Sequence, residues 1–193
     1  MKLVFASSNS HKINEIKKLL PENIELLGLN DIECFDEIPE TAETIEGNAI
    51  LKADYITQKY GYNCFADDSG LEINALGGKP GVYSARYAGE PRDDNKNINK
   101  VLAELENQSD RGANFKTVIC LNLNGHQYLF TGIIDGNITQ ERKGSNGFGY
   151  DPIFVPDGYD ETFAQMAFEE KNQISHRAKA VMQMIDFFEK KSI

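Results

Sequence analysis

Short apolar runs and helically spaced apolar residues alternate along this chain. Runs of apolar residues predict strands, and apolar residues recurring every three or four positions predict helices with one buried face. The strands predicted in this way are residues 2–6, 24–29 and 62–66, and the helices are residues 11–20, 44–60, 93–107 and about 175–191. Because helices and strands interleave, we expect an α/β protein with a mixed sheet.

A hairpin is predicted near the middle of the chain. Two apolar runs, residues 115–123 and 126–134, are separated only by Asn124 and Gly125, a strong signal for a tight turn between paired strands. Residues 153–155 form one more short strand candidate. The glycine-rich stretches at residues 76–91 and 144–152 predict structured loops instead of regular elements.

The net charge of the chain argues against one class of function, the binding of nucleic acid. Thirty acidic residues against twenty basic ones give a net charge of −10, the opposite of a chain that grips nucleic acid through its phosphates. No apolar run reaches the length of a membrane helix, and the first residues do not resemble a secretory signal. The three cysteines, Cys34, Cys64 and Cys120, are odd in number and widely spaced. We therefore expect a cytoplasmic protein with reduced thiols and with neither a disulfide framework nor a zinc site.

The polar residues 7–12 lie between a predicted strand and a predicted helix. Such a turn directs backbone N–H groups and the positive helix end at an anion, and Asn9 and Lys12 add an amide and an ammonium. The alternative is that Ser10 only caps the helix and that Lys12 is solvated. The sequence lacks the GxxxxGK[ST] pattern, so this is not a Walker loop.

Two adjacent acids, Asp67 and Asp68, follow a predicted strand. Neighbouring side chains of an extended chain face opposite sides, so one carboxylate is expected to face a cleft and the other the interior. Carboxylates are ligands that Mg²⁺ prefers, and a carboxylate can also accept a proton from water. The alternative is an acidic turn with Gly70 at a positive φ angle. Glu40, before the second helix, is either a metal ligand or a favourable charge at a helix start.

The last third of the chain carries further polar and aromatic candidates. The glycines of residues 144–149 mimic a dinucleotide fingerprint, but no helix is predicted after them, which excludes a Rossmann site. Phe148 and Tyr150 either present a ring to a flat ligand or belong to the core. Ser175 is a plausible helix cap, which places His176 and Arg177 in the first helical turn.

Taken together, these clusters resemble the inosine triphosphate pyrophosphatase family. The resemblance runs from about residue 3 to residue 188 and is carried by SSNSHKINEI, ETAETIEGNAILKA, FADDSGLEINALGGKPGVYSARYAG, GSNGFGYDPIFVP and EEKNQISHRAKA. It implies an elongated α/β fold, with a central mixed β-sheet, flanking helices and two lobes around a substrate cleft. It also implies one nucleotide pyrophosphatase domain over residues 1–193, acting as a cytoplasmic homodimer that needs Mg²⁺.

The resemblance also implies an activity. The expected reaction hydrolyses dITP, ITP and XTP between the α and β phosphates, releasing pyrophosphate and keeping deaminated purines out of DNA and RNA. One alternative is a pyrophosphatase of related fold for pyrimidine or modified nucleotides. Another is a nucleotide sensor without turnover, against which the acids Glu40, Asp67 and Asp68 argue.

Site residues carry over from the family by matching positions. Asp68 would accept the proton and, with Glu40, hold Mg²⁺; the residues that would contact substrate are Ser7, Ser8, Asn9, Ser10, His11, Lys12, Ser69, Phe148, Gly149, Tyr150, Asp151, Lys171, His176 and Arg177. The chain departs from the family pattern chiefly at His11 and Ala42, where glycine is usual or frequent. A histidine that cannot adopt a glycine-only conformation would reshape the phosphate loop.

Overall fold

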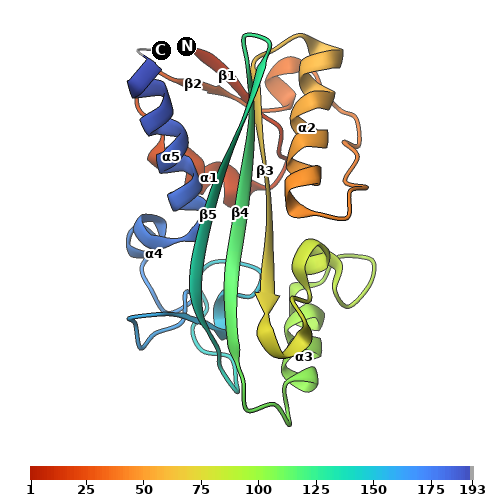
Figure 1. Cartoon of the computed structure of the whole chain (residues 1–193), viewed down its shortest axis with the longest axis vertical. Helices are drawn as coiled ribbons and strands as arrows, with labels where there is room; N and C mark the ends of the chain where they lie inside the picture. The colour runs from red at the N-terminus through yellow and green to blue at the C-terminus, as the bar shows by residue number, and fades with distance from the viewer. Residues whose placement is uncertain (192–193) are drawn as a thin grey trace. The chain divides into compact units, whose positions relative to one another are not determined.

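A computed structural model describes residues 1–191, and within them six strands form one sheet in the order β2-β1-β3-β4-β5-β6 (Figure 1). The strands are β1 (Lys2–Phe5), β2 (Glu25–Leu27), β3 (Cys64–Ile73), β4 (Gly112–Leu123), β5 (His126–Ile138) and β6 (Phe154–Pro156). β1 pairs in parallel with β2 and β3, whereas β5 and β6 are antiparallel. Asn124 and Gly125, both at positive φ, connect β4 to β5 as the hairpin prediction requires. The α/β class with a mixed sheet is confirmed.

The helices match the apolar spacing of the sequence, with one addition. They are α1 (Ser10–Leu19), α2 (Ile45–Tyr60), α3 (Asp94–Glu104), α4 (Phe168–Ile174) and α5 (His176–Lys191). The sequence did not predict the seven-residue α4, because it is too short to show a helical repeat. Within residues 1–191, no helix combines the length and the apolar character needed to cross a membrane.

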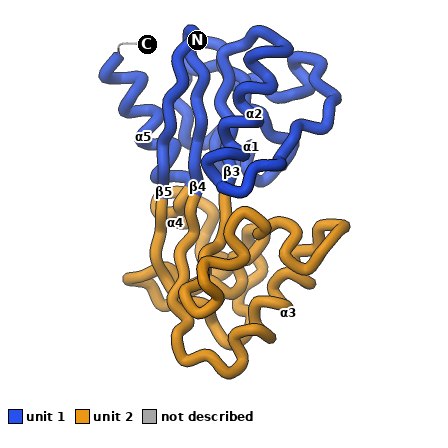
Figure 2. Tube along the Cα trace, turned by 45° about the vertical axis from the view of Figure 1, so that its right-hand side comes forward, with its two compact units in different colours: residues 1–68, 117–132, 177–193 blue, residues 69–116, 133–176 orange. Residues whose placement is uncertain are grey.

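The chain divides into two compact units, coloured blue and orange in Figure 2. Unit 1 contains Met1–Asp68, Thr117–Gly132 and the chain from Arg177 on, and unit 2 contains Ser69–Lys116 and Ile133–His176. Each unit has a hydrophobic core of its own. The expectation of a substrate cleft stays a prediction.

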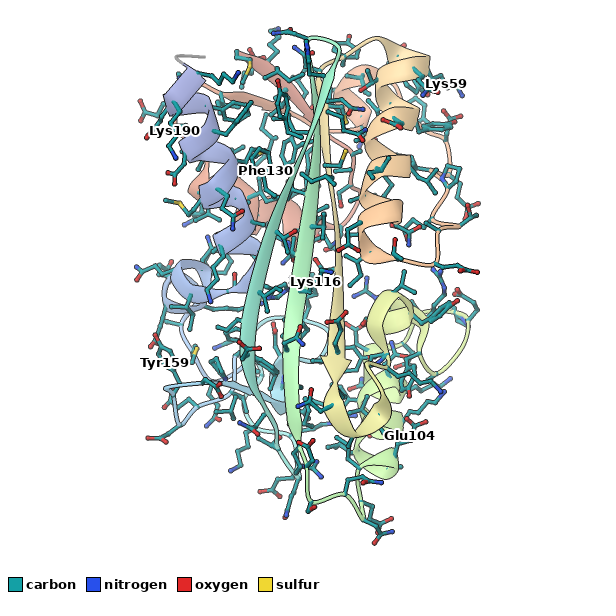
Figure 3. All side chains as sticks on the ribbon, in the orientation of Figure 1. Lys59, Glu104, Lys116, Phe130, Tyr159 and Lys190 are labelled. Atoms are coloured by element: carbon teal, nitrogen blue, oxygen red, sulfur yellow. The ribbon has the colours of Figure 1, made fainter. Side chains whose placement is uncertain are left out.

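Unit 1 packs helices on both faces of its strands. On one face, Phe5 and Phe65 of the sheet pack with Ile16 of α1 and with Val181 of α5, and Phe130, labelled in Figure 3, joins the same cluster. On the other side lies α2, whose buried positions recur at helical spacing at Ile45, Asn48, Ala49, Lys52, Ala53 and Ile56 (Figure 1). Burial of these apolar faces holds α1, α2 and α5 on the sheet.

Unit 2 is organised around α3. Its buried Ile98 and Val101 pack in one cluster with Leu71 of β3 and with the rings of Phe154 and Phe163. This cluster supports the glycine-rich loop of residues 144–150, which carries several of the candidate site residues.

The acidic pair lies within a strand, not in a turn. β3 continues through Asp67 and Asp68 to Ile73, and Gly70 is a strand residue without a positive φ angle. The interpretation of this segment as a turn after a shorter strand is therefore wrong. The physical reason is that cations from other elements pair with both acids, so that charged residues can occupy buried strand positions.

Candidate active site

Asp67 and Asp68 lie next to each other on β3 and face different helices of unit 1. Asp67 Oδ1 is 3.0 Å from Lys12 Nζ of α1, and Asp67 Oδ2 is 3.1 Å from Arg177 Nε of α5. Asp68 Oδ1 is 3.2 Å from Lys52 Nζ of α2. The two carboxylates face different helices, as neighbouring strand residues should, and both are buried; that one of them faces a cleft stays a prediction.

Asp67 is held as a carboxylate. Burial on its own would raise the pKa of Asp67, but the charges of Lys12 and Arg177 outweigh burial and hold that pKa well below its usual range. Arg177 is 1 % exposed and also pairs with Glu15 of α1. These four residues form one ion-pair network, Glu15–Arg177–Asp67–Lys12, which ties α1, β3 and α5 together.

Asp68 is in a different electrostatic position. Burial raises the pKa of Asp68, and the nearby charges of Lys52 and Lys12 offset only part of that effect. Its Oδ2 atom is buried and accepts no hydrogen bond from residues 1–191. Neighbouring carboxylates whose pKa values are pushed in opposite directions are typical of sites where one acts as a charge and the other exchanges protons.

Lys52, which was not among the residues predicted from the sequence, links Asp68 to Glu40. Its Nζ lies 2.5 Å from Glu40 Oε1, as well as within hydrogen-bond distance of Asp68. Burial alone would lower the pKa of Lys52, but Asp68 and Glu40 raise it above its ordinary value, so the side chain remains an ammonium. The helical spacing could have indicated Lys52, because a charged residue at a buried position of the apolar α2 repeat must have a partner. The same spacing could have indicated Glu15, which lies beside Ile16 on the buried face of α1.

The loop of residues 7–12 is closed by its own asparagine. Asn9 caps α1, and its Oδ1 accepts hydrogen bonds from the N–H groups of His11 and Lys12 at 3.0 and 3.3 Å. The alternative with Ser10 as the cap is wrong, because Ser10 is the first helical residue. Asn9 also occupies two N–H groups that were expected to be open to an anion. His11 is helical and does not need a positive φ angle, so a histidine fits there without strain.

A cavity of about 280 Å³ lies beside the same loop in unit 1. Its lining includes Ser7, Ser8, Ile13 and residues 26–31, near the carboxyl ends of β1 and β2. None of the charged residues around Asp67 and Asp68 lines it. The charged cluster around Asp67 and Asp68 and this cavity are therefore separate features of unit 1.

Unit 2 brings together Phe148, Asp151 and Lys171. Asp151 Oδ2 accepts hydrogen bonds from Phe148 N at 2.9 Å and from Lys171 Nζ at 2.7 Å. Lys171 Nζ also lies 4.8 Å from the centre of the Phe148 ring. Gly147 allows this approach, because a Cβ atom there would lie 2.0 Å from Asp151 Oδ2. An aromatic ring of the loop, the carboxylate that follows it and a cation from α4 are thus held together, a combination suited to a flat polar ligand.

The remaining predicted site residues mainly contact other groups of the protein. Tyr150 is buried in the core of unit 2, and its hydroxyl donates to Ser84 O at 2.8 Å. The His176 ring stacks on Phe115 with centroids 4.6 Å apart. Ser69 lies on β3 and is partly buried. Arg177 follows His176 in sequence, but its guanidinium pairs with the carboxylates of unit 1.

The fold and the charged residues define a class of protein: an α/β protein whose mixed sheet carries two buried, charge-paired carboxylates on a central strand. The chain belongs to the Ham1 family, whose family model matches residues 3–187. The resemblance found in the sequence is thereby confirmed over nearly the whole chain.

Individual relatives agree with this assignment. The chain is 64% identical to a Flavobacterium johnsoniae protein named dITP/XTP pyrophosphatase, over 96% of this chain and 97% of the relative. It is 42% identical to a Bacillus subtilis protein of the same name, over 96% of each. Among solved structures, the Staphylococcus aureus Ham1 protein is 42% identical with a TM-score of 0.91, covering 99% of this chain and 100% of that one. A HAM1 protein from Coxiella burnetii gives 40% and 0.92, covering 98% and 99%.

Proposed function

We propose that this chain hydrolyses dITP, ITP and XTP between the α and β phosphates and so removes deaminated purines from the nucleotide pool that supplies DNA and RNA. The names of its relatives support the substrates. The observation that carries the proposal is the pair Asp67 and Asp68, because both oxygens of Asp67 pair with cations whereas Asp68 has a buried Oδ2 without a hydrogen-bond donor among residues 1–191.

Asp68 is the proposed proton acceptor. Its buried Oδ2 atom has no hydrogen-bond donor among residues 1–191, which leaves a position where a water molecule could donate. A water molecule would donate a proton to Asp68 while its oxygen forms a bond to phosphorus. The bond from that phosphorus to the oxygen bridging the α and β phosphates then breaks, which leaves a monophosphate and pyrophosphate.

Lys12 is the proposed phosphate ligand of unit 1. Asp67 fixes its ammonium, and Arg177 and Glu15 fix Asp67 in turn. A phosphate oxygen would share the Lys12 charge with Asp67. Residues 7–11 would lie beside that phosphate. In this arrangement Arg177 acts through Asp67, which differs from the expectation that Arg177 contacts the substrate itself.

Glu40 and Asp68 suit Mg²⁺ as a cofactor. Both offer carboxylate oxygens, both contact Lys52, and Asp68 Oδ2 is buried without a hydrogen-bond donor among residues 1–191. Two carboxylates fit Mg²⁺, which usually takes few protein ligands and completes its shell with water and substrate phosphates. When bound, the ion would neutralise phosphate charge and favour ionisation of the attacking water.

The loop of unit 2 is the proposed binding element for the base. Phe148 would stack on the purine ring, and the Lys171 ammonium, held beside that ring by Asp151, would donate to the 6-keto oxygen. His176 is a second candidate donor. Adenine presents an amino group at this position, so a donor would face a donor, a mismatch that rejects a ligand strongly.

A nucleotide panel tests the proposal. Pyrophosphate release should be efficient with dITP, ITP and XTP, and at least about 100-fold slower in kcat/KM with dATP and dGTP. Excess EDTA should abolish release and added Mg²⁺ should restore it. Comparable kcat/KM for dITP and dGTP would overturn the purine assignment, and release without any divalent cation would overturn the metal assignment.

We further propose, from the family resemblance, that the chain acts as a homodimer in the cytoplasm. Sedimentation equilibrium of the purified chain tests the first point, and fractionation of cells that express it tests the second.

A further inference from the structure

The loop of residues 144–150 in unit 2 is held by contacts of two kinds. Some come from chain segments close to it: Ala164 O accepts from the N–H groups of Ser145 and Asn146, and Asp151 accepts from Phe148 N. Gly144, Gly147 and Gly149 all have positive φ angles, a backbone with high freedom in the unfolded chain. The conformation of this loop therefore depends on its hydrogen bonds.

A second kind of contact comes from α3, far away in sequence. Asp94 Oδ2 accepts a hydrogen bond from Gly149 N at 2.9 Å, across 55 residues. Arg92 donates to Asp94 Oδ1 at 3.0 Å and so orients the carboxylate. The same helix end also holds Arg142, just before the loop, through Asn95 and Asn99. The start of α3 thus fastens the loop at two points.

We infer that Asp94 is a positioning residue for the purine base: by binding Gly149 N–H it fixes the direction of the Phe148 ring, without touching the base itself. The inference rests on the proposed function, because it assigns Phe148 to the base. Phe148 is held from one side by Asp151 and Lys171, and its following peptide is held by Asp94. Loss of the second contact frees the ring to rotate with the Gly149 backbone.

Asp93 provides the matched control. It is the neighbouring acid at the same helix start, and its side chain caps α3 by accepting from Lys96 N at 3.0 Å. Both acids are partly exposed, so both can be replaced without opening the core. An effect that comes only from weakening the start of α3 would appear in Asp93→Ala as well as in Asp94→Ala.

The experiment compares Asp94→Ala, Asp94→Asn and Asp93→Ala with the unaltered protein. In Asp94→Ala, the Gly149 amide should exchange its hydrogen about tenfold faster by NMR. KM for dITP should rise about tenfold with kcat little changed, because a misplaced stacking ring weakens binding of the base equally in the ground state and the transition state. Inhibition by inorganic tripolyphosphate, which has no base, should stay the same. Asp94→Asn, whose amide oxygen can still accept from Gly149 N–H, should recover most of the wild-type KM.

The outcomes separate this inference from the proposed function. If the unaltered protein hydrolyses dITP but Asp94→Ala keeps the wild-type KM, or if Asp93→Ala raises KM equally, the role of Asp94 is refuted and the proposed function stands. If Asp94→Ala weakens tripolyphosphate as much as dITP, the effect is not specific to the base and the inference also fails. If the unaltered protein neither binds nor hydrolyses dITP, the proposed function fails and takes the inference with it.

Discussion

Lys12, Asp67 and Asp68 show how side chains of ordinary type acquire different chemistry from their surroundings. Asp67 has two cations against its two oxygens, whereas Asp68 shares Lys52 with Glu40 and keeps one oxygen open. Burial acts on both acids in the same direction, so the difference between their pKa values comes from the number and placement of the paired charges.

Replacing Asp68 should therefore lower mainly the turnover number, whereas replacing Asp67 should lower mainly the stability. Asp68→Asn keeps the size of the side chain and an acceptor for Lys52, so we expect it to stay folded. Its kcat for dITP should fall by about 100-fold or more, the scale of a lost general base. Pyrophosphate release and thermal melting measure the two quantities. A folded Asp68→Asn protein with near-normal kcat would remove Asp68 from the mechanism.

The matched change at the neighbouring acid tests stability instead. Asp67→Asn leaves Lys12 and Arg177 with one fewer carboxylate in a buried network, which typically costs about 3–5 kcal/mol of unfolding free energy. Urea unfolding followed by circular dichroism gives this number. A stability equal to that of Asp68→Asn would show that the network around Asp67 does not hold the helices.

The environment of Lys12 predicts how KM for dITP depends on pH. Burial lowers the pKa of Lys12 below the ordinary value of 10.5, although Asp67 partly opposes this. Only the ammonium binds phosphate, so KM for dITP should rise as the pH increases through this lowered pKa. Lys12→Arg should move the rise to higher pH, because a guanidinium keeps its proton. KM measured from about pH 7 to about pH 10 shows the shift; Lys17→Arg, an exposed change on the same helix, should leave the profile as it is.

At the scale of elements, the start of α2 carries the loop that presents Glu40. Thr44 caps the helix, and Asn48 Oδ1 accepts from Ala42 N at 2.9 Å. Gly47 lies against this loop, because a Cβ atom there would be 2.6 Å from Ala42 Cβ. The alanine at position 42, a departure from the family pattern, is thus accommodated by the glycine at position 47.

Gly47→Ala should consequently destabilise the protein by about 1–3 kcal/mol, the usual cost of overpacking. The double variant Ala42→Gly with Gly47→Ala should regain most of this loss, since the two methyl groups no longer meet. A double-mutant cycle in urea measures the coupling between the positions. Independent, additive effects would mean that the loop does not dock on α2 as described.

The elements themselves were largely predictable, whereas their charged contacts were not. Apolar repeats predicted α1, α2, α3 and α5, because burial of one face leaves a local pattern. β3 was predicted too short, because two adjacent aspartates are typical of a turn and the local sequence does not show the cations that pair with them. The cations of Asp67 lie 55 and 110 residues away in sequence, at Lys12 and Arg177, and the cation of Asp68 lies 16 residues away, at Lys52. Local pattern does not reveal such pairing; family resemblance named Asp68 but not Lys52 or Glu15.

At the scale of the whole molecule, the two units share their strands. β3, β4 and β5 each contribute residues to both, and the chain passes from one unit to the other four times, after residues 68, 116, 132 and 176 (Figure 2). Neither unit is a continuous piece of sequence. Each strand must keep its ladder of hydrogen bonds to hold the residues of either unit in place.

Unfolding should accordingly be one transition. The chain has no tryptophan and eight tyrosines, so tyrosine fluorescence and far-ultraviolet circular dichroism give two independent probes in urea. We expect coincident midpoints and slopes, the mark of a two-state process. Two separated transitions would show that one unit stays folded after the other is lost.

The network Glu15–Arg177–Asp67–Lys12 also restricts how this chain can evolve. Each residue of the network neutralises another, so a substitution at one position leaves an uncompensated charge in the interior. Reversal of that substitution restores the stability that was lost. We therefore expect substitutions at the four positions to be coupled, although 162 residues separate Glu15 from Arg177. In a library randomised at these four positions and selected only for folding, we expect survivors to carry balanced charge or none. Survivors with a single unbalanced charge would show that the interior tolerates an uncompensated charge at these positions.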